Sequence, residues 1–529
     1  MTQSSMFAPP FSLTDGSGEQ VSFAADGPAI VCFIKEDCPT CREVMPVLAA
    51  FHKAFSGIMD VHVVGQTSQG NAALESEFSP PFNLLDDSAL KVSFAAGIDT
   101  VPTLFAYDAQ GELTDTLIGF VKGEWQTLAA RLGEQSGHQA DPGWADLPDW
   151  RPGCGSLSVD PMIAPRLQAE AENSPLRARR IDIGVHDDEI EFMFDQGFSD
   201  GLPLVPPTPE RVMRMLAGTQ RDAQEVLAVM PPNMGEVTVE KVAINAVMAG
   251  CKPEYMPVIN TIVQAICTDE YNIHGVMATT MGASPVIVVN GPVRERLGMN
   301  MKLGALGQGN RANATIGRAV RLIIRNVGGA KPGGTERSTL GNPMKITMCF
   351  AEWEERNPWS PLHVERGFDE NDSVVSIFTM TSGPTLIVDQ DSRSASQLAG
   401  TMGLCLDSAF NTKSHFGTDC LLVIVPEHVD TLIRDGYTKQ DIRDRIQEVT
   451  ARPIHQLAAD EVSGAGFKPD VIAGMDETTR NKMLPKFRSN DDIHIVVAGS
   501  EAGKFTGAFH GWATGEIGSM PVSRKIEEM

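Results

Sequence analysis

The amino-acid sequence predicts an α/β protein in which two domains are separated by a connecting segment. Short apolar runs of strand length alternate with stretches of helical periodicity over most of the chain. Residues 136–185 interrupt this alternation with text rich in Gly, Pro and Asp. A chain of 529 residues is also long enough for about two to four domains. We therefore expect domains at 1–135 and 186–529, joined by 136–185.

The first domain is expected to alternate strands and helices. The run AIVCFI at 29–34 is short and wholly apolar, as is typical of a buried strand. The following helix is marked over 43–55 by apolar residues on one face. Further strands are expected at 60–65, 101–108 and 113–120, followed by a helix over 124–132. In the connecting segment, Trp144 and Trp150 indicate that the chain packs on a surface.

The second domain is expected to be larger and also mixed α/β. Thr208 and Thr238 each precede a helical stretch as N-caps, and Pro209 takes the first helical position of the former. Strands are expected at 284–291, 344–350, 373–378, 384–389, 420–426 and 493–499.

Composition and charge narrow the class of partner. The 43 Lys and Arg residues against 68 Asp and Glu give a formal net charge of −25, which repels phosphate backbones and anionic membranes. We find no secretory signal, and no apolar run approaches the roughly 20 residues that span a bilayer. Nine cysteines without an export signal favour reduced thiols with one redox pair. We expect a cytoplasmic homo-oligomer that binds neither nucleic acid nor membrane.

The strongest chemical signal is Cys38-Pro-Thr-Cys41, directly after the strand at 29–34 and at the start of a helix. This spacing places two thiols within disulfide reach, and the helix N-terminus stabilises the thiolate of the first. Such a thiolate attacks a disulfide, and the second cysteine resolves the mixed disulfide. Half of a zinc site and an inert pair are the alternatives, but no second C-x-x-C or H-x₃₋₅-H follows. We predict a redox pair and no metal.

The order of strand, CPTC loop, helix and strand, followed by Thr100-Val101-Pro102-Thr103, resembles the thioredoxin-like fold over residues 7 to about 132. The opening FAPPFSLTDGSGEQVSF is similar to the start of the peroxiredoxin and TlpA-type branch. The resemblance implies that Cys38 is the nucleophile, that Cys41 resolves, and that Pro102 is the cis-proline where substrates dock.

Two features differ from thioredoxin. Glu36 and Asp37 stand where a Trp usually precedes the first cysteine, and two nearby carboxylates are expected to disfavour its thiolate. Cys154 lies in the connecting segment, where an exposed thiol is a liability, so its presence suggests use; an incidental linker cysteine is the alternative. The remaining cysteines are expected to be core residues: Cys32, Cys251, Cys267, Cys349, Cys405 and Cys420.

In the larger domain, residues 304–318 form a glycine-rich loop that leads into a helix with a basic ridge of Arg318, Arg321 and Arg325. Small residues let a backbone approach a ligand, and a helix N-terminus favours an anion. The loop fits G-x-G-x-x-A, but the strand and the acidic residue of a dinucleotide site are missing. An anion or substrate loop and a structural turn stay open. His363 and Glu365 would share one face of a strand, although a structural histidine is the commoner case.

The candidate substrate-binding residues are Asp200, His274, Gly307, Gly309, Arg311, Asn313, Arg318, His363 and Glu365. Four segments that contain most of them, FSDGLPLVPPT, VEKVAINAVMAGCKPEY, RANATIGR and HVERGF, resemble poorly characterised bacterial proteins associated with UGSC-type selenoproteins. The resemblance spans about 186–529 and implies thiol- or selenol-dependent chemistry. Cys154-Gly-Ser is similar to the start of that tetrad, with Leu157 at its last position.

Together these observations predict a thiol-dependent oxidoreductase without a cofactor. The first domain would pass reducing equivalents through Cys154 to the larger domain, which would act on a small, anionic substrate. A thiol reductant or a redox partner protein would restore the dithiol. The alternatives are a general protein thiol-disulfide reductase, with the larger domain as a docking or oligomerisation module, and a metal-dependent lyase or hydrolase.

Overall fold

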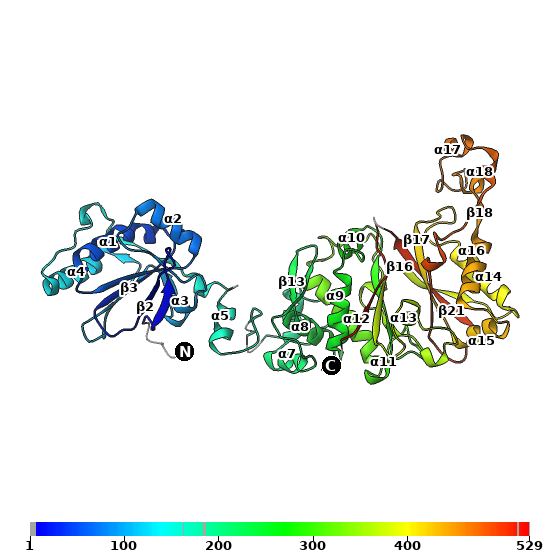
Figure 1. Cartoon of the computed structure of the whole chain (residues 1–529), viewed down its shortest axis with the longest axis horizontal. Helices are drawn as coiled ribbons and strands as arrows, with labels where there is room; N and C mark the ends of the chain where they lie inside the picture. Colours follow the sequence, from blue (N-terminus) through cyan, green and yellow to red (C-terminus); the bar gives the residue numbers. More distant parts are fainter. Residues whose placement is uncertain (1–6, 162, 182, 185–186, 516–517, 528–529) are drawn as a thin grey trace. The chain divides into compact units, whose positions relative to one another are not determined.

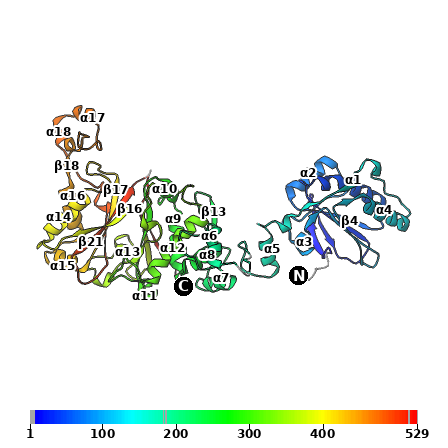
Figure 2. The same cartoon turned by 180° about the vertical axis from the view of Figure 1, so that it is seen from behind.

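The computed structural model describes residues 7–161, 163–181, 183–184, 187–515 and 518–527. The chain forms two compact units, Met1–Ile181 and Asp182–Met529, here called the N-terminal and C-terminal units. Both units are mixed α/β, which confirms the predicted fold class (Figures 1 and 2). In the described part of the chain, no helix is both long enough and apolar enough to cross a membrane.

The N-terminal unit is built on a five-stranded sheet. Its elements are β1 (Phe11–Thr14), β2 (Gln20–Phe23), β3 (Ala29–Ile34), α1 (Pro39–Phe55), β4 (Asp60–Gly65), α2 (Ser68–Phe78), β5 (Leu85–Asp86), α3 (Lys91–Ala95), β6 (Thr100–Val101), β7 (Thr103–Tyr107), β8 (Leu113–Ile118), β9 (Phe120–Val121), α4 (Lys122–Ser136), β10 (Trp150–Arg151), β11 (Cys154–Gly155) and α5 (Ala164–Ala171). The strand order is β5-β4-β3-β7-β8, with β3 parallel to β4 and antiparallel to β7.

The predicted strands at 29–34 and 60–65 are β3 and β4, and every residue of β3 is buried. The predicted strand at 101–108 is broken into β6 and β7 by a cis peptide bond between Val101 and Pro102. Helix α1 begins at Pro39, four residues earlier than predicted, because a proline at the first helical position loses no hydrogen bond.

Residues 144–171 belong to the N-terminal unit rather than to a free connector. Strand β10 pairs with β9 and β11 pairs with β6, while α5 contacts α3. Trp144 packs against the hydrophobic core of this unit, as expected, but Trp150 is 61% exposed. The division between the two compact units lies at Ile181, within the segment 136–185 that is predicted to connect the domains.

The C-terminal unit contains a seven-stranded mixed sheet. Its elements are α6 (Glu189–Asp195), α7 (Pro209–Leu216), β12 (Val226–Met230), β13 (Gly235–Thr238), α8 (Val239–Ala249), α9 (Met256–Ile266), α10 (Ile273–Ala278), β14 (Ser284–Asn290), α11 (Val293–Arg296), α12 (Arg311–Asn326), β15 (Cys349–Ala351), α13 (Leu362–Glu365), β16 (Val374–Val388), α14 (Ala395–Leu406), β17 (Thr418–Ile424), α15 (Pro426–Arg434), α16 (Lys439–Thr450), β18 (Arg452–Pro453), α17 (Pro469–Ala473), α18 (Glu477–Asn481), β19 (Met483–Leu484), β20 (Ile493–Val497), β21 (Phe505–Ala513) and β22 (Val522–Lys525). The order is β15-β14-β16-β21-β17-β20, with β22 also paired to β16.

Strand β16 connects the two halves of this sheet. It covers both predicted strands at 373–378 and 384–389, pairing with β14 near its start and with β21 near its end. Both views show α8, α9 and α12 on one side of these strands and α14, α15 and α16 on the other (Figures 1 and 2). Thr208 and Thr238 cap α7 and α8 as predicted.

Two local predictions in the C-terminal unit are wrong. Most of the strand expected at 344–350 is a short 3₁₀ turn and loop, and only its end joins β15. His363 and Glu365 lie in the helix α13 and not on a strand, so they do not share a strand face. Both segments are short, and the periodicity of apolar residues over so few positions does not distinguish a strand from a helical turn.

We expect Gly511→Ala to destabilise the C-terminal unit. A Cβ at Gly511 would lie 1.7 Å from Oδ1 of the buried Asp419, so β17 and β21 would have to separate. Overpacking of this kind costs about 1–3 kcal/mol. The free energy of unfolding from urea titration, followed by circular dichroism, measures the effect. Gly417→Ala is the matched control, since a Cβ there meets no atom within 4 Å; equal loss in both variants would contradict the prediction.

Candidate active site

The Cys38–Cys41 pair sits at the junction of β3 and α1. Cys38 is the N-cap of α1, and its sulfur accepts a hydrogen bond from the backbone N–H of Cys41 at 3.4 Å. The backbone N–H of Lys35 donates to the Cys41 sulfur at 3.4 Å. Both cysteine side chains are buried, and all nine cysteines of the chain are free thiols in the described residues. The pair therefore lies where the sequence predicts it, between the buried strand β3 and the N-terminus of α1.

The surroundings of the pair separate the roles of its two thiols. Hydrogen bonding from the Cys41 thiol, and then from Cys154 and the N–H groups of Cys41 and Thr40, lowers the pKa of Cys38 to about 5 against the opposing effect of burial. Burial, together with the neighbouring Cys38 thiolate, raises the pKa of Cys41 well above the ordinary value. At neutral pH the site therefore holds a thiolate at Cys38 and a protonated thiol at Cys41.

The expectation that Glu36 and Asp37 disfavour the thiolate is wrong. The Asp37 carboxylate forms an ion pair with the Lys35 ammonium group at 3.1 Å and is exposed to solvent. The Glu36 side chain lies against Gly70 and Thr67 at the start of α2. Hydrogen bonds to Cys38 lower its pKa in spite of these carboxylates, while Asp37 helps to raise the pKa of the neighbouring Cys154.

Cys154 is brought to this pair by strand pairing. We call Trp150–Val159 the strap. In the strap, Cys154 pairs in antiparallel register with Val101, the residue before the cis-proline Pro102. Cys38 Sγ lies 3.5 Å from the Val101 carbonyl oxygen, and the neighbouring Cys154 thiol helps to lower the pKa of Cys38. Burial and the Cys38 thiolate raise the pKa of Cys154 to about 11, so this half-buried thiol is also protonated.

Buried polar residues fix the strap on the far side of Cys154. The Gln66 amide donates to Ser156 Oγ at 2.7 Å and to Ser93 Oγ at 3.1 Å, and its oxygen accepts from Leu157 N at 3.0 Å. Ser158 Oγ donates to the Ile98 carbonyl at 2.9 Å. Sequence reasoning missed Gln66, because no local spacing links it to the strap.

The structure disperses the predicted substrate residues of the C-terminal unit. Arg318 donates to both Asp200 oxygens at 2.8 Å; burial raises the pKa of Asp200, but Arg318 outweighs it and the pKa is lowered. Arg321 is buried, with Nε on the Lys345 carbonyl. Glu365 pairs with Lys439 and Arg443. The predicted basic ridge is therefore largely engaged in internal contacts.

The remaining predicted residues lie around the glycine loop or on the surface. Asn313 is buried and holds the loop through Asn300 N and O, at 3.0 and 2.8 Å, which is a structural use. Gly307 and Gly309 are exposed, as is His274 on α10. Arg311 is also exposed, although it donates to the carbonyls of Gly250 and Cys251.

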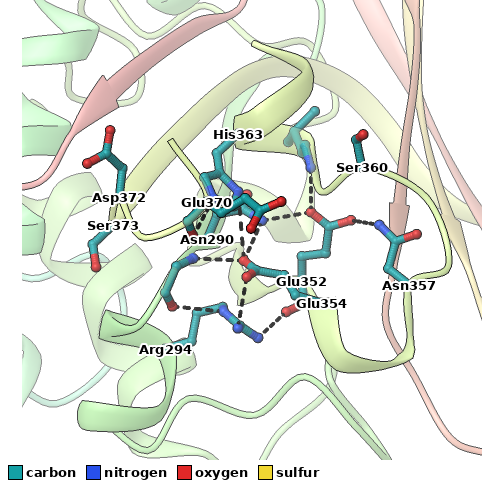
Figure 3. Close-up of polar contacts among 12 residues, drawn as sticks. Asn290, Arg294, Glu352, Glu354, Asn357, Ser360, His363, Glu370, Asp372 and Ser373 are labelled. Atoms are coloured by element: carbon teal, nitrogen blue, oxygen red, sulfur yellow. Dashed lines mark hydrogen bonds and ion pairs between the residues drawn. The ribbon is translucent and has the colours of Figure 1, made fainter. Parts of the chain in front are cut away.

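His363 instead joins a buried polar cluster that the sequence did not indicate (Figure 3). Glu352 accepts from Asn290 at 2.7 Å, from the N–H of Leu362 at 2.8 Å and from Asn357 at 2.9 Å. Burial raises its pKa. Glu354 accepts from the same Asn290 and pairs with Arg294 at 3.0 Å, while His363 Nδ1 lies 3.9 Å from Glu354. The cluster joins residues distant in sequence, which explains why motif spacing did not find it.

A second buried polar group lies between β17 and β20. His494 Nε2 is 3.3 Å from Asp419 Oδ2, and Arg366 is 3.5 Å from His494 Nδ1. Burial raises the pKa of Asp419 to about 7. Burial, and to a smaller extent the positive charge of Arg366, lowers the pKa of His494 well below its usual range.

A pocket of about 440 Å³ beside α14 is lined by none of the predicted site residues.

None of the five described cysteines of the C-terminal unit has a lowered thiol pKa like that of Cys38. Burial raises the pKa of Cys251 and of Cys267 to about 12, and it also raises that of Cys349, Cys405 and Cys420. Cys267 and Cys405 are half-buried rather than fully buried as expected. Over the residues with described positions, no group of three or more His, Cys, Asp or Glu is placed to hold a metal ion.

Comparisons with known proteins agree with the geometry of the N-terminal unit. The AhpC/TSA family matches residues 6–116, so this part is a thioredoxin-like domain. Among solved structures, a putative thiol:disulfide interchange protein DsbE from Chlorobium tepidum is 19% identical and matches 24% of this chain and 94% of its own, with a TM-score of 0.23. StoA from Bacillus subtilis is 23% identical over 23% of this chain and 98% of its own, with a TM-score of 0.21. No curated protein matches, and the UGSC-type resemblance stays a prediction.

Removing the Cys154 thiol tests its effect on Cys38. In Cys154→Ala the pKa of Cys38 should rise from about 5 by roughly one unit, because a hydrogen bond to a charged group contributes about 1.5 kcal/mol or more. The rate of Cys38 alkylation by iodoacetamide rises with pH as the thiolate forms, so its midpoint reports the pKa. Cys405→Ala is the control, and identical midpoints in all three proteins would refute the contact.

The cluster of Figure 3 predicts a large effect of Arg294→Met. This change leaves Glu354, whose side chain is only 14% exposed, without its cation and should lower the free energy of unfolding by about 3 kcal/mol. Adding Glu354→Gln should restore part of the loss. The matched control is Arg356→Met, whose pair with Asp430 is more exposed and worth about 1 kcal/mol or less. Urea unfolding measures all four proteins; equal losses for the two arginines would contradict a buried ion pair.

Proposed function

We propose that this protein is a thiol-disulfide oxidoreductase in which three thiols of the N-terminal unit act in sequence. Cys38 is the nucleophile, Cys41 resolves, and Cys154 exchanges with the substrate. The observation that carries this proposal is the pairing of Cys154 with Val101, which holds a third thiol against the Cys38 thiolate.

The proposed exchange balances in atoms, electrons and protons. Cys154 first exchanges with a small disulfide and releases one thiol, so that it carries a mixed disulfide. The Cys38 thiolate attacks the Cys154 sulfur and expels the second substrate sulfur as a thiolate. The Cys41 sulfur then attacks Cys38, its proton passing to Cys154, and a Cys38–Cys41 disulfide remains. A thiol reductant or a redox partner protein reduces that disulfide again.

The pKa order of the three thiols supports this division. Cys38, with a pKa of about 5, is ionised and ready to attack at neutral pH. Cys154, with a pKa of about 11, is protonated beside the Cys38 thiolate, so its exchange with the substrate is the slow step, and its proton leaves on the released substrate thiol. Once Cys38 is bound in a disulfide its negative charge is gone, so the pKa of Cys41 falls and resolution becomes easier.

For the C-terminal unit we propose a role in binding a small, anionic substrate rather than in thiol chemistry. Its cysteines have raised pKa values, whereas Arg311 is an exposed cation at the glycine-rich loop. Fusion of a binding unit to a reductase raises the effective concentration of one for the other. Cytoplasmic location and self-association remain part of the proposal.

Trapping the intermediate tests the function. In Cys41→Ser, incubation with glutathione disulfide should accumulate a Cys38–Cys154 disulfide, because the final step lacks its thiol. Non-reducing digestion and mass spectrometry detect the linked peptides. The double variant Cys41→Ser/Cys154→Ser should carry no such link, and Cys405→Ser should behave as the parent protein. Accumulation of glutathione on Cys38 alone would refute the role of Cys154.

A further inference from the structure

The strap lies along the edge of the short strand β6, next to the cysteine pair. An extended peptide binds such an edge by pairing its backbone with unpaired N–H and C=O groups. Here the edge is Asp99–Val101, and the chain itself supplies the partner strand. Cys154 pairs with Val101 and Gly155 with Thr100, and the Ser156 N–H donates to the Asp99 carbonyl at 3.0 Å.

Side chains around the cysteine pair fasten the strap further. Thr40, between Cys38 and Cys41, donates its hydroxyl to the Pro152 carbonyl at 2.6 Å. The Lys35 ammonium group donates to the Gly155 carbonyl at 3.1 Å. These contacts lie on both sides of Cys154, and Cys38 beneath it has no exposed surface.

We infer that the strap is a built-in occupant of the polypeptide-docking edge, which excludes protein disulfides from Cys38 and leaves Cys154 as the entry point for small substrates. This inference rests on the proposed function, since it assumes that Cys38 is the nucleophile. It assigns the specificity of the site to Pro152–Cys154, a segment outside the family match at 6–116.

The strap is fastened in a way that permits release. Arg151, Pro152 and Gly155 are exposed, and Trp150 is 61% exposed, so docking buries little apolar surface. Its backbone pairing consists of the two-residue ladders β10–β9 and β11–β6. Segments with few buried apolar contacts open at low free energy. By contrast, Ser156 and Ser158 are buried, and Ser156 is hydrogen-bonded to Gln66. We expect this end of the strap to stay in place when the rest opens.

Gly153 provides a specific way to displace the strap. A Cβ at this position would lie 2.2 Å from the Thr100 side chain and 2.8 Å from the Val101 carbonyl oxygen, so Gly153→Ala is incompatible with docking. At Gly155 a Cβ meets no atom within 4 Å, which makes Gly155→Ala the matched control. Both positions flank Cys154 and leave all three thiols in place.

The experiment compares insulin reduction by the full-length chain and both variants, with dithiothreitol as reductant and its uncatalysed rate subtracted. The Gly153→Ala protein should reduce insulin roughly tenfold faster than the parent protein. The reason is that a clash of this size shifts the equilibrium between the docked and the released strap by about the same factor. Gly155→Ala should match the parent protein. Cys38 should also be alkylated faster by iodoacetamide in Gly153→Ala alone.

Each result decides the inference. Unchanged insulin reduction in Gly153→Ala, with or without faster alkylation of Cys38, overturns it, as does an equal gain in both variants. If Cys41→Ser forms the Cys38–Cys154 disulfide but Gly153→Ala gains no insulin reduction, the proposed function stands and the strap does not select substrates. If Gly153→Ala gains activity but the Cys38–Cys154 disulfide never forms, the strap blocks protein substrates and the exchange through Cys154 is wrong.

Discussion

The pairing of Cys154 with Val101 is the interaction on which the thiol site depends. It satisfies backbone groups beside the cis-proline, covers Cys38, and places a third thiol where it helps to lower the pKa of Cys38. A two-residue ladder is weak by itself, so the strap also relies on Thr40, Lys35 and the buried Gln66 network. The same contacts that position Cys154 therefore control access to the nucleophile.

Three chemically identical side chains acquire different roles from their surroundings. Cys38 lies at a helix N-terminus and accepts hydrogen bonds, which favours its thiolate. Cys41 and Cys154 are penalised by burial and by the charge already present on Cys38. Only one of three neighbouring thiols is thus ionised at neutral pH, and this asymmetry gives the proposed exchange its direction.

The C-terminal unit uses its charged residues mainly inside the fold. Arg294, Arg318 and Arg321 each bind a carboxylate or a carbonyl within the unit. Glu352 is buried among hydrogen-bond donors in the cluster of Figure 3. Removing water from a charge is costly unless partners replace it, so such residues require one another. Arg318 and Arg321 of the predicted basic ridge are thus held by contacts inside this domain.

The features that depend on neighbouring residues could be predicted from the sequence: the buried strand β3, the CPTC turn at the start of α1, and the caps Thr208 and Thr238. These features follow from local periodicity and capping chemistry. The sequence also identified Cys154 as a thiol of interest, but not its position. Three contacts became visible only in the folded chain: Cys154 lies near Cys38, Arg318 binds Asp200, and His363 lies beside Glu354. Each of these contacts joins residues far apart in the chain, and no periodicity encodes which strand edges and buried charges will meet.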